Sequence, residues 1–225
     1  MKRRIPVQGS AVAIALLLAG TAALAAPPAG GKVERVDLSA GTRKVHNRRV
    51  APLVDGNRSG IRLDEAAGDG LVWFPETEFS NGTIELDIRG RDAMGRSFVG
   101  VAFHGVDAET FDAVYFRPFN FHSPDPARRA HSLQYISHPT YTWHKLRSEH
   151  PGQYEKEIAS APQPNDWFHA RIVVAHPKVS VFVDGATRPS LVVDQLSDRG
   201  EGWVGVWVGN GSNGDFANLS VRSDP

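Results

Sequence analysis

The chain has 225 residues, and its 25 basic side chains balance its 25 acidic ones, for a formal net charge of zero. Proteins that bind nucleic acid ordinarily carry a basic excess, so we expect no nucleic-acid partner. The sequence contains no cysteine, which excludes disulfide bonds, a cysteine nucleophile and a lipid-anchored cysteine.

The N-terminal segment has the composition of a secretory signal peptide. Lys2, Arg3 and Arg4 precede a short apolar run over residues 11–20, and Ala-Leu-Ala at 23–25 forms a cleavage site. The apolar run is shorter than the roughly 20 residues that a membrane span requires. We therefore expect a bacterial protein that is exported to the periplasm or the medium, with no membrane span after cleavage.

The composition divides the chain into three expected segments. They are a signal peptide over residues 1–25, a flexible lead-in over residues 26–31 and one domain over residues 32–225. A mature chain of about 200 residues suits a single domain and buries enough surface to fold without disulfide bonds. The sequence leaves the oligomeric state open.

Beyond the lead-in, the hydrophobic pattern has a period of two. Over residues 82–90, three aliphatic residues alternate with charged residues, which predicts a half-buried strand that begins at the Asn81-Gly82 turn. Further strands are predicted over residues 32–38, 43–50, 70–76, 97–105, 112–118, 132–136, 167–175, 178–185, 190–196, 202–209 and 215–221. Many short strands with turn residues between them are typical of an all-β antiparallel β-sandwich or jelly roll.

One helix is predicted, over residues 141–149, and it ends before Pro151-Gly152. It lies in a long insertion between Ile136 and Trp167, and such insertions are often functional. Trp143 and Arg147 are four residues apart and share one face of this helix. The segment could cover a binding cleft; a surface helix that docks through Trp143 is the alternative.

Residues 113–136 combine strand-like runs with polar groups that suit ligand binding. Tyr115 and Arg117 face one side of a predicted strand, and Pro118 must end that strand, form a bulge or lie at an edge. We then expect Arg117, Asn120 and His122 to point into a cleft. The alternative is that Arg117 pairs with a carboxylate and that the neighbouring Phe residues belong to the core.

The strand after this loop supplies two more candidates, Gln134 and Tyr135. Planar amide and guanidinium donors beside aromatic faces are the groups that bind sugar hydroxyls. The predicted ligand contacts are listed together: Arg117, Asn120, Gln134, Tyr135 and Trp143, with His104 and Arg147 flanking them.

Tryptophan and glycine alternate over residues 202–209. Trp203 and Trp207 lie on one face with Gly205 and Gly209, which predicts flat indoles with open space beside them. Sugar rings stack on such platforms, much as other apolar rings do. The alternative is that the tryptophan face belongs to the core.

Candidates for acid–base chemistry are few. Glu85 and Asp87 are two apart on a strand and share a face, and two carboxylates in different environments can divide the work of glycoside cleavage. Two exposed carboxylates on a polar strand face are the commoner situation. His104, His131 and Glu149 complete the candidates. No ligand spacing such as His-Glu-x-x-His occurs, so no metal site is predicted.

Several of these segments together resemble the concanavalin A-like lectin/glucanase superfamily. They are FSNGTIELDIRG, SFVGVAFHG, YFRPFN, DWFHARIVV with KVSVFVDG, and GWVGVWVGNGSNGDFANLSV, and the resemblance runs from about Phe79 to Val221. Within the superfamily the chain looks most similar to uncharacterised exported bacterial proteins and to 3-keto-disaccharide hydrolase domains.

The resemblance implies two curved antiparallel sheets, with a carbohydrate ligand on the concave face. Laminarinase-type members carry Glu-x-Asp-x-x-Glu on a strand of that face, whereas this chain has Gly90 in place of the last acid after Glu85 and Asp87. This departure counts against retaining glycosidase chemistry by that route. Calcium occurs in some members, but no cluster of Asp and Asn residues here demands it, and no cofactor is expected.

The sequence thus predicts an exported carbohydrate-binding jelly-roll domain. Two alternatives stay open: a glycoside-active enzyme, either a hydrolase or a lyase of the 3-keto-disaccharide hydrolase type, and a structural or protein-interaction domain of the cell envelope. Fold resemblance alone does not decide between them.

Overall fold

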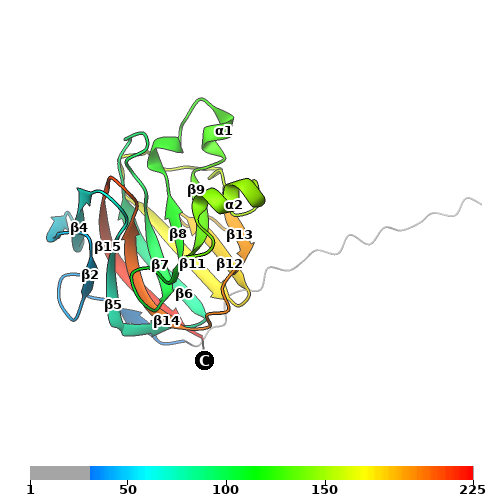
Figure 1. The fold of residues 1–225 in the computed structure, drawn as a ribbon. Helices are drawn as coiled ribbons and strands as arrows, with labels where there is room; N and C mark the ends of the chain where they lie inside the picture. The colour runs from blue at the N-terminus through cyan, green and yellow to red at the C-terminus, as the bar shows by residue number, and fades with distance from the viewer. Residues whose placement is uncertain (1–30, 225) are drawn as a thin grey trace, which may run out of the picture.

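The computed structural model describes residues 31–224. The predicted signal peptide over residues 1–25 and all but the last residue of the lead-in over residues 26–31 lie outside the described residues. Within residues 31–224, two antiparallel sheets pack face to face (Figure 1). The predicted antiparallel β-sandwich with a jelly-roll fold is confirmed.

The first sheet has eight strands, and the second has seven. In spatial order the eight-stranded sheet contains β13 (Leu191–Asp194), β12 (Lys178–Val183), β11 (Phe168–Ala175), β6 (Gly82–Arg89), β15 (Ser212–Ser223), β4 (Arg58–Ala66) and β3 (Val50–Asp55), with β1 (Val33–Arg35) also paired to β15. The seven-stranded sheet contains β10 (Glu155–Lys156), β9 (Leu133–His138), β8 (Phe111–Phe116), β7 (Val99–Gly105), β14 (Gly202–Val208), β5 (Gly70–Phe79) and β2 (Lys44–His46).

Alternating aliphatic side chains form the core between the two sheets. Ile84, Leu86 and Ile88 of β6 are fully buried there, and Val204 and Val206 of β14 join the same cluster from the other sheet. Burying one such side chain contributes about 1.5–3 kcal/mol. Because side chains alternate along a strand, the neighbours of these residues face outward, and the outer faces carry the polar chemistry.

The strand prediction missed one hairpin. Strands β3 and β4 pair from Val50 opposite Leu63 to Asp55 opposite Arg58, with a two-residue turn at Gly56-Asn57. Gly56 has a φ of 60°, which favours glycine. A Gly-Asn pair is a hairpin signal, but the charged residues on β4 interrupt the hydrophobic pattern that would have revealed the strand.

The predicted helix is confirmed as α2 (Trp143–Glu149), which lies in front of the seven-stranded sheet (Figure 1). Thr142 caps it, since the Thr142 side chain accepts a hydrogen bond from the Lys145 backbone N–H. Two short elements come before β9, a 3-10 turn η1 (Pro118–Asn120) and helix α1 (Pro126–Arg129). No helix within residues 31–224 has the length and apolar composition needed to cross a bilayer.

Candidate functional site

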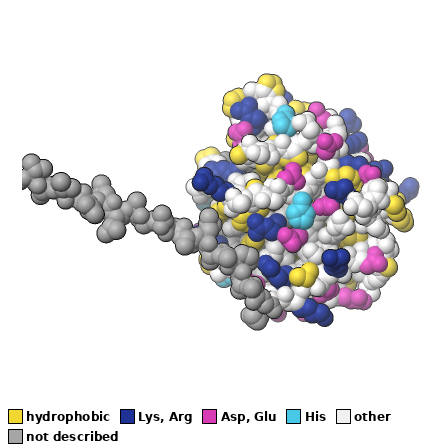
Figure 2. Space-filling view, turned by 180° about the vertical axis from the view of Figure 1, so that it is seen from behind, with side chains coloured by type: hydrophobic (Ala, Val, Ile, Leu, Met, Phe, Trp, Pro, Cys, Tyr) yellow, Lys and Arg dark blue, Asp and Glu magenta, His cyan; other side chains and the backbone are white. Residues whose placement is uncertain are grey.

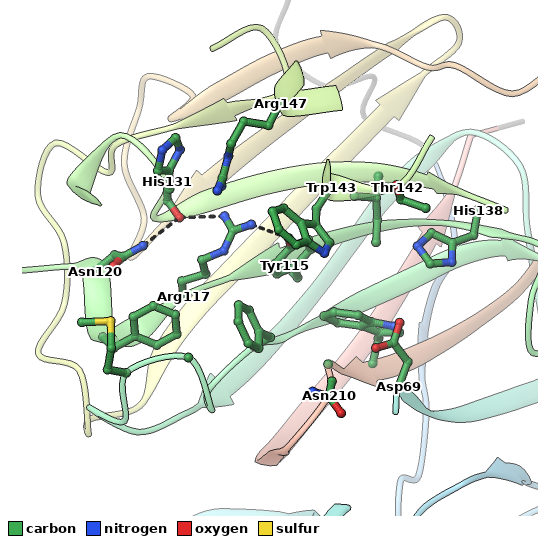
Figure 3. A pocket seen from close by; sticks show the side chains of 17 residues that line it. Asp69, Tyr115, Arg117, Asn120, His131, His138, Thr142, Trp143, Arg147 and Asn210 are labelled. Carbon is green, nitrogen blue, oxygen red and sulfur yellow. Dashed lines mark hydrogen bonds between the residues drawn. The ribbon is translucent and has the colours of Figure 1, made fainter. Parts of the chain in front are cut away.

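A pocket of about 500 Å³ lies between α2 and the outer face of the seven-stranded sheet (Figure 3). Its apolar lining consists of Met94, Phe98, Tyr115, Phe119, Ile136, Trp143 and Trp207. Its polar lining consists of Asp69, Arg117, Asn120, His131, His138, Thr142, Arg147 and Asn210, and Gly95 and Gly209 complete it. Small-molecule sites commonly have this size and this mixture of apolar walls and convergent polar groups.

The end of β8 places Tyr115 and Arg117 in this pocket. The strand ends at Phe116, and η1 begins at Pro118, as predicted from the missing proline N–H. Arg117 Nη1 donates to the His131 carbonyl at 2.8 Å, and Nη2 donates to Tyr115 Oη and to Gln134 Oε1. Tyr115 Oη in turn donates to Gln134 Oε1 at 2.9 Å. The guanidinium is therefore held rigidly on one wall.

Burial governs the electrostatics of this wall. Arg117 is 4% exposed, and its burial lowers the pKa of the guanidinium from its ordinary value. Burial also raises the pKa of Tyr115 to about 12, so the phenol stays protonated at neutral pH. The nearest carboxylate, Glu155, has Oε2 3.8 Å from Arg117 Nη1, beyond hydrogen-bond distance.

Helix α2 closes the pocket from above. Leu146 is buried beneath the helix, whereas Trp143 at its N-terminal end is 45% exposed. Arg147 binds Glu155 of β10 through two hydrogen bonds, Nε to Oε1 at 3.0 Å and Nη2 to Oε2 at 2.7 Å. This bidentate pair and the Thr142 cap hold α2 against the sheet, with Trp143 over the pocket (Figure 3).

The pocket floor is aromatic. Trp207 and Tyr115 have ring centroids 4.9 Å apart, and Phe98 packs edge-on against both Tyr115 and Phe119. Trp203 lies outside the pocket, where its ring packs against another tryptophan and carries the Lys44 ammonium 3.7 Å from its centroid.

The expectation of open space beside the two indoles is wrong at Gly205. A Cβ at this position would lie 2.6 Å from the indole of Trp73, which is 2% exposed and fills the space. The expectation is also wrong at Gly209, which lines the pocket but where an added Cβ would lie 2.8 Å from Phe98 and 3.0 Å from the Trp207 indole. Both glycines therefore let aromatic rings pack closely against the backbone.

The far end of the pocket carries a carboxylate. Asp69 precedes β5, and Figure 3 shows it with Asn210 at the end away from Arg147 and His131. Burial raises the pKa of Asp69, although the nearby charges of His138 and Arg48 oppose the rise. Burial likewise lowers the pKa of His138, which stacks on Phe111 at 4.9 Å.

Four of the predicted contacts thus line one pocket: Arg117, Asn120, Trp143 and Arg147. Gln134 lies behind the wall, where it accepts from Arg117 and Tyr115 and its Nε2 lies 3.5 Å from the Trp143 carbonyl. Its role there is to position Arg117.

Tyr135 does not reach the pocket. Because Gln134 faces outward, Tyr135 faces the core between the sheets, where it is fully buried and donates to Asp112 Oδ1 at 2.7 Å. The proposed direct contact through Tyr135 is corrected accordingly.

His104 also lies elsewhere, in a buried polar cluster. It is 1% exposed, its Nε2 lies 2.7 Å from the Ser80 carbonyl, and its Nδ1 lies 2.9 Å from Gln195 Nε2. Burial lowers the pKa of His104. This cluster ties the segment after β13 to the seven-stranded sheet and does not flank the pocket.

The carboxylates Glu85 and Asp87 lie on the outer face of the other sheet. Asp87 accepts from Arg58 at 3.0 Å, from Asn218 at 2.8 Å and from His169 Nδ1 at 2.9 Å. Figure 2 shows the side of the molecule opposite the view of Figure 1, where basic and acidic side chains are interspersed. Both acids belong to an ion-pair network with Arg58 and His169 on the eight-stranded sheet, whereas the pocket lies on the seven-stranded sheet.

Of the two remaining acid–base candidates, one lies in the pocket and the other does not. Glu149 is exposed on α2 and pairs with Lys145 at 2.7 Å. His131 lines the pocket, and its Nδ1 lies 2.8 Å from Glu155 Oε2. Burial lowers the pKa of His131.

Sequence reasoning missed Asp69, His138 and Glu155 as site residues. Asp69 stands in a Gly-Asp-Gly turn, and Glu155 stands in the insertion, so neither carries a local signal. Hydrogen-bonded strands bring them to the site. Among residues 31–224, no group of three or more His, Asp or Glu residues is arranged to hold a metal ion.

No family model and no curated protein matches the chain. Solved structures do: the carbohydrate binding module CBM66 from Bacillus subtilis matches with a TM-score of 0.58 and 15% identity, over 80% of this chain and 94% of that one. A Bacillus subtilis protein with a galectin-like fold matches with a TM-score of 0.57 and 10% identity, over 84% and 94%.

The GH16 protein of a Bacteroides ovatus mixed linkage glucan PUL, in complex with a product, matches with a TM-score of 0.50 and 11% identity, over 84% of this chain and 99% of that one. At such low identities these likenesses establish the fold alone. Together with the sheet topology, they show that this protein has an antiparallel jelly-roll fold similar to those of the carbohydrate binding module and the galectin-like protein.

Proposed function

We propose that the protein is an exported carbohydrate-binding domain that holds a saccharide in the pocket beneath α2. The observation that carries this proposal is the pocket itself, about 500 Å³ in volume, with an aromatic floor and a polar rim. Sugars present apolar C–H faces and a ring of hydroxyl groups, and this lining offers a counterpart to each. The jelly-roll neighbours that are carbohydrate-binding modules or sugar-complexed proteins support the same ligand class.

The polar groups of the pocket are placed where they can form hydrogen bonds with the hydroxyl groups of a sugar. Arg117 is fixed by neutral acceptors, and the side-chain amide of Asn120 beside it makes a long hydrogen bond, 3.3 Å from Nδ2 to the His131 carbonyl. At the far end, Asp69 provides carboxylate oxygens that accept from hydroxyl groups. Trp143 lies above and offers an indole face to the ring between them.

The test is a screen of neutral and acidic oligosaccharides and polysaccharides that records thermal stabilisation and released reducing sugar in the same wells. A ligand that raises the melting temperature without product release supports a binding domain. If no saccharide in the screen changes the melting temperature or yields product, the proposal fails.

A glycoside-active enzyme is the second candidate, and a specific observation favours it. The pocket contains an imidazole close to a carboxylate, with His131 Nδ1 2.8 Å from Glu155 Oε2, and a second carboxylate, Asp69, whose pKa burial raises. Such groups suit general acid–base work in either hydrolysis or elimination.

If the screen detects product, substitutions can test whether the catalytic acids lie in this pocket or on the other sheet. Asp69→Asn should then abolish turnover while Glu85→Gln and Asp87→Asn leave it unchanged, because those two acids lie on the opposite sheet. Loss of turnover in the Glu85 or Asp87 variants would instead contradict the assignment of the chemistry to this pocket.

The envelope-interaction hypothesis predicts that the face carrying Arg117 is flat and covered. A pocket in that face counts against it.

A further inference from the structure

The arginine end of the pocket holds two guanidinium groups and one carboxylate. Arg117 and Arg147 line the pocket, and Glu155 lies behind them with 3% exposure. Burial lowers the pKa of His131 from its ordinary value, and the charges of Arg147 and Arg117 act in the same direction, whereas Glu155 opposes the shift, so we count the imidazole as neutral. This end therefore carries one unit of positive charge in excess.

The excess charge belongs to Arg117. Both Glu155 oxygens are engaged by Arg147, and one of them also lies 2.8 Å from His131 Nδ1. The hydrogen bonds of Arg117 go instead to neutral groups, a backbone carbonyl, a phenol and an amide. A buried guanidinium without a directly bonded carboxylate is costly to a fold unless a ligand uses it.

Donors remain open beside that charge. Within residues 31–224, Arg147 Nη1 makes no hydrogen bond, and the Arg147 side chain lines the pocket and is 34% exposed. The amide of Asn120 holds the 3.3 Å contact described above. Charge-assisted hydrogen bonds from a guanidinium to an anionic oxygen are roughly twice as strong as neutral ones.

The opposite end has the opposite polarity. Asp69 lies there and is separated from the arginines by Trp143 and the aromatic floor (Figure 3). An anion is repelled from the Asp69 end and attracted to the arginine end, so the pocket orients an asymmetric ligand.

We propose that the saccharide held in this pocket is acidic, with a carboxylate or sulfate group bound by Arg147 and Asn120 over the buried Arg117. The neutral hydroxyl groups of the same ligand then face Asp69. This inference rests on the proposed carbohydrate-binding function and names its ligand class.

Matched ligand pairs test it on the unaltered protein. Galacturonate oligosaccharides are compared with their methyl esters, and sulfated galactan oligosaccharides with their desulfated counterparts, by titration calorimetry at low and high ionic strength. We expect the acidic member of one pair to bind at least roughly tenfold more tightly at low ionic strength, and the advantage to shrink as salt is added. The pair that responds identifies the anionic group.

Two variants on the same helix then locate the effect. Arg147→Gln should remove most of the preference for the acidic member. Lys145→Gln removes an equal charge from α2, but Lys145 does not line the pocket and pairs with Glu149, so this variant should keep the preference. A preference retained in a folded Arg147→Gln variant overturns the assignment to this end of the pocket.

The outcomes separate the two proposals. Equal or tighter binding of the neutral members overturns the acidic-ligand inference and leaves carbohydrate binding intact. If neither member of either pair binds, and no saccharide in the wider screen changes the melting temperature or yields product, the carbohydrate-binding proposal and the acidic-ligand inference are both overturned. Should Arg147→Gln fail to fold, the ligand pairs on the unaltered protein still decide.

Discussion

Arg147 and Glu155 join the helix above the pocket to the edge strand beside it. Their two hydrogen bonds, at 3.0 and 2.7 Å, connect α2 to β10 across eight residues of chain. Glu155 is 3% exposed, so the pair is shielded from water on its carboxylate side. Together with the Thr142 cap and the buried Leu146, this buried acid holds α2, and with it Trp143, over the pocket.

Replacing that acid should weaken the fold. Glu155→Gln leaves Arg147 without its carboxylate and removes the negative charge nearest to Arg117, and we expect the free energy of unfolding to fall by about 1–3 kcal/mol. Urea denaturation measures it. Glu157→Gln is the control, because Glu157 forms an exposed pair with Arg129 and should cost less than about 1 kcal/mol. Equal losses in the two variants would contradict the role of Glu155.

The two tyrosines of adjacent strands should behave differently. Tyr135→Phe removes the donor to Asp112 Oδ1 and the acceptor of the Leu196 N–H, so unfolding should become easier by about 1–3 kcal/mol without a change in saccharide affinity. Tyr115→Phe removes a hydroxyl that holds Arg117 on the pocket wall and should lower the affinity. Denaturation and ligand titration on both variants check this. An affinity loss in Tyr135→Phe would restore it as a ligand contact.

Trp143→Ala should reduce saccharide affinity several-fold, because an aromatic contact contributes about 1 kcal/mol. Stability should change little, since the Trp143 side chain is 45% exposed. Trp167→Ala is the control: that indole lies beside Arg58 and Arg89 and donates to Asp55, on the other sheet. The Trp167→Ala variant should be less stable but keep its saccharide affinity. An affinity loss in Trp167→Ala with none in Trp143→Ala would place the ligand on the eight-stranded sheet instead.

Gly205→Ala should destabilise the protein by about 1–3 kcal/mol through overpacking. The added Cβ would lie 2.6 Å from the Trp73 ring and from the Val72 carbonyl oxygen, which cannot move without disturbing the sheet. Gly200→Ala is the matched control, since a Cβ there meets nothing within 4 Å. Thermal denaturation compares the two, and a neutral Gly205→Ala would show that Trp73 is free to shift.

His169 should make stability depend on pH. The hydrogen bond to Asp87 raises the pKa of His169, with burial opposing it, and Glu85 lies 3.8 Å away. Burial pushes the pKa of Asp87 upward, but hydrogen bonds from His169, Asn218 and Arg58 outweigh it, so Asp87 is ionised well below neutral pH.

A group whose pKa is raised in the folded state stabilises the protein at pH values below its unfolded-state pKa. This stabilisation is lost as the pH rises through the folded-state pKa. The melting temperature of His169→Gln should therefore fall furthest below that of the unaltered protein near pH 6, and the gap should narrow by about pH 9. His46→Gln, which alters an exposed histidine on β2, should show no such trend. A melting-temperature difference between the unaltered protein and His169→Gln that widens with rising pH would contradict a raised pKa of His169.

Local pattern was enough to predict much of this fold. The alternation around Ile84, the strand end before Pro118 and the helix after Thr142 each depend on neighbouring residues, so the sequence alone predicts them. The segregation of Tyr115 and Arg117 from Val114 and Phe116 follows from the same period of two.

The tertiary structure decided which face of each strand became a site. Alternation shows that the two faces of a strand differ, but it does not say which face meets the other sheet. Tyr135 therefore turned out to be core, and Asp87 turned out to lie on the sheet away from the pocket.

The same reason accounts for the residues that sequence reasoning missed. Asp69 enters the pocket because β5 pairs with β14, more than a hundred residues later in the chain, and Trp73 fills the space at Gly205 through that same pairing. Local sequence sets the conformation of each strand, whereas long-range hydrogen bonding and the packing of the two sheets determine which side chains meet.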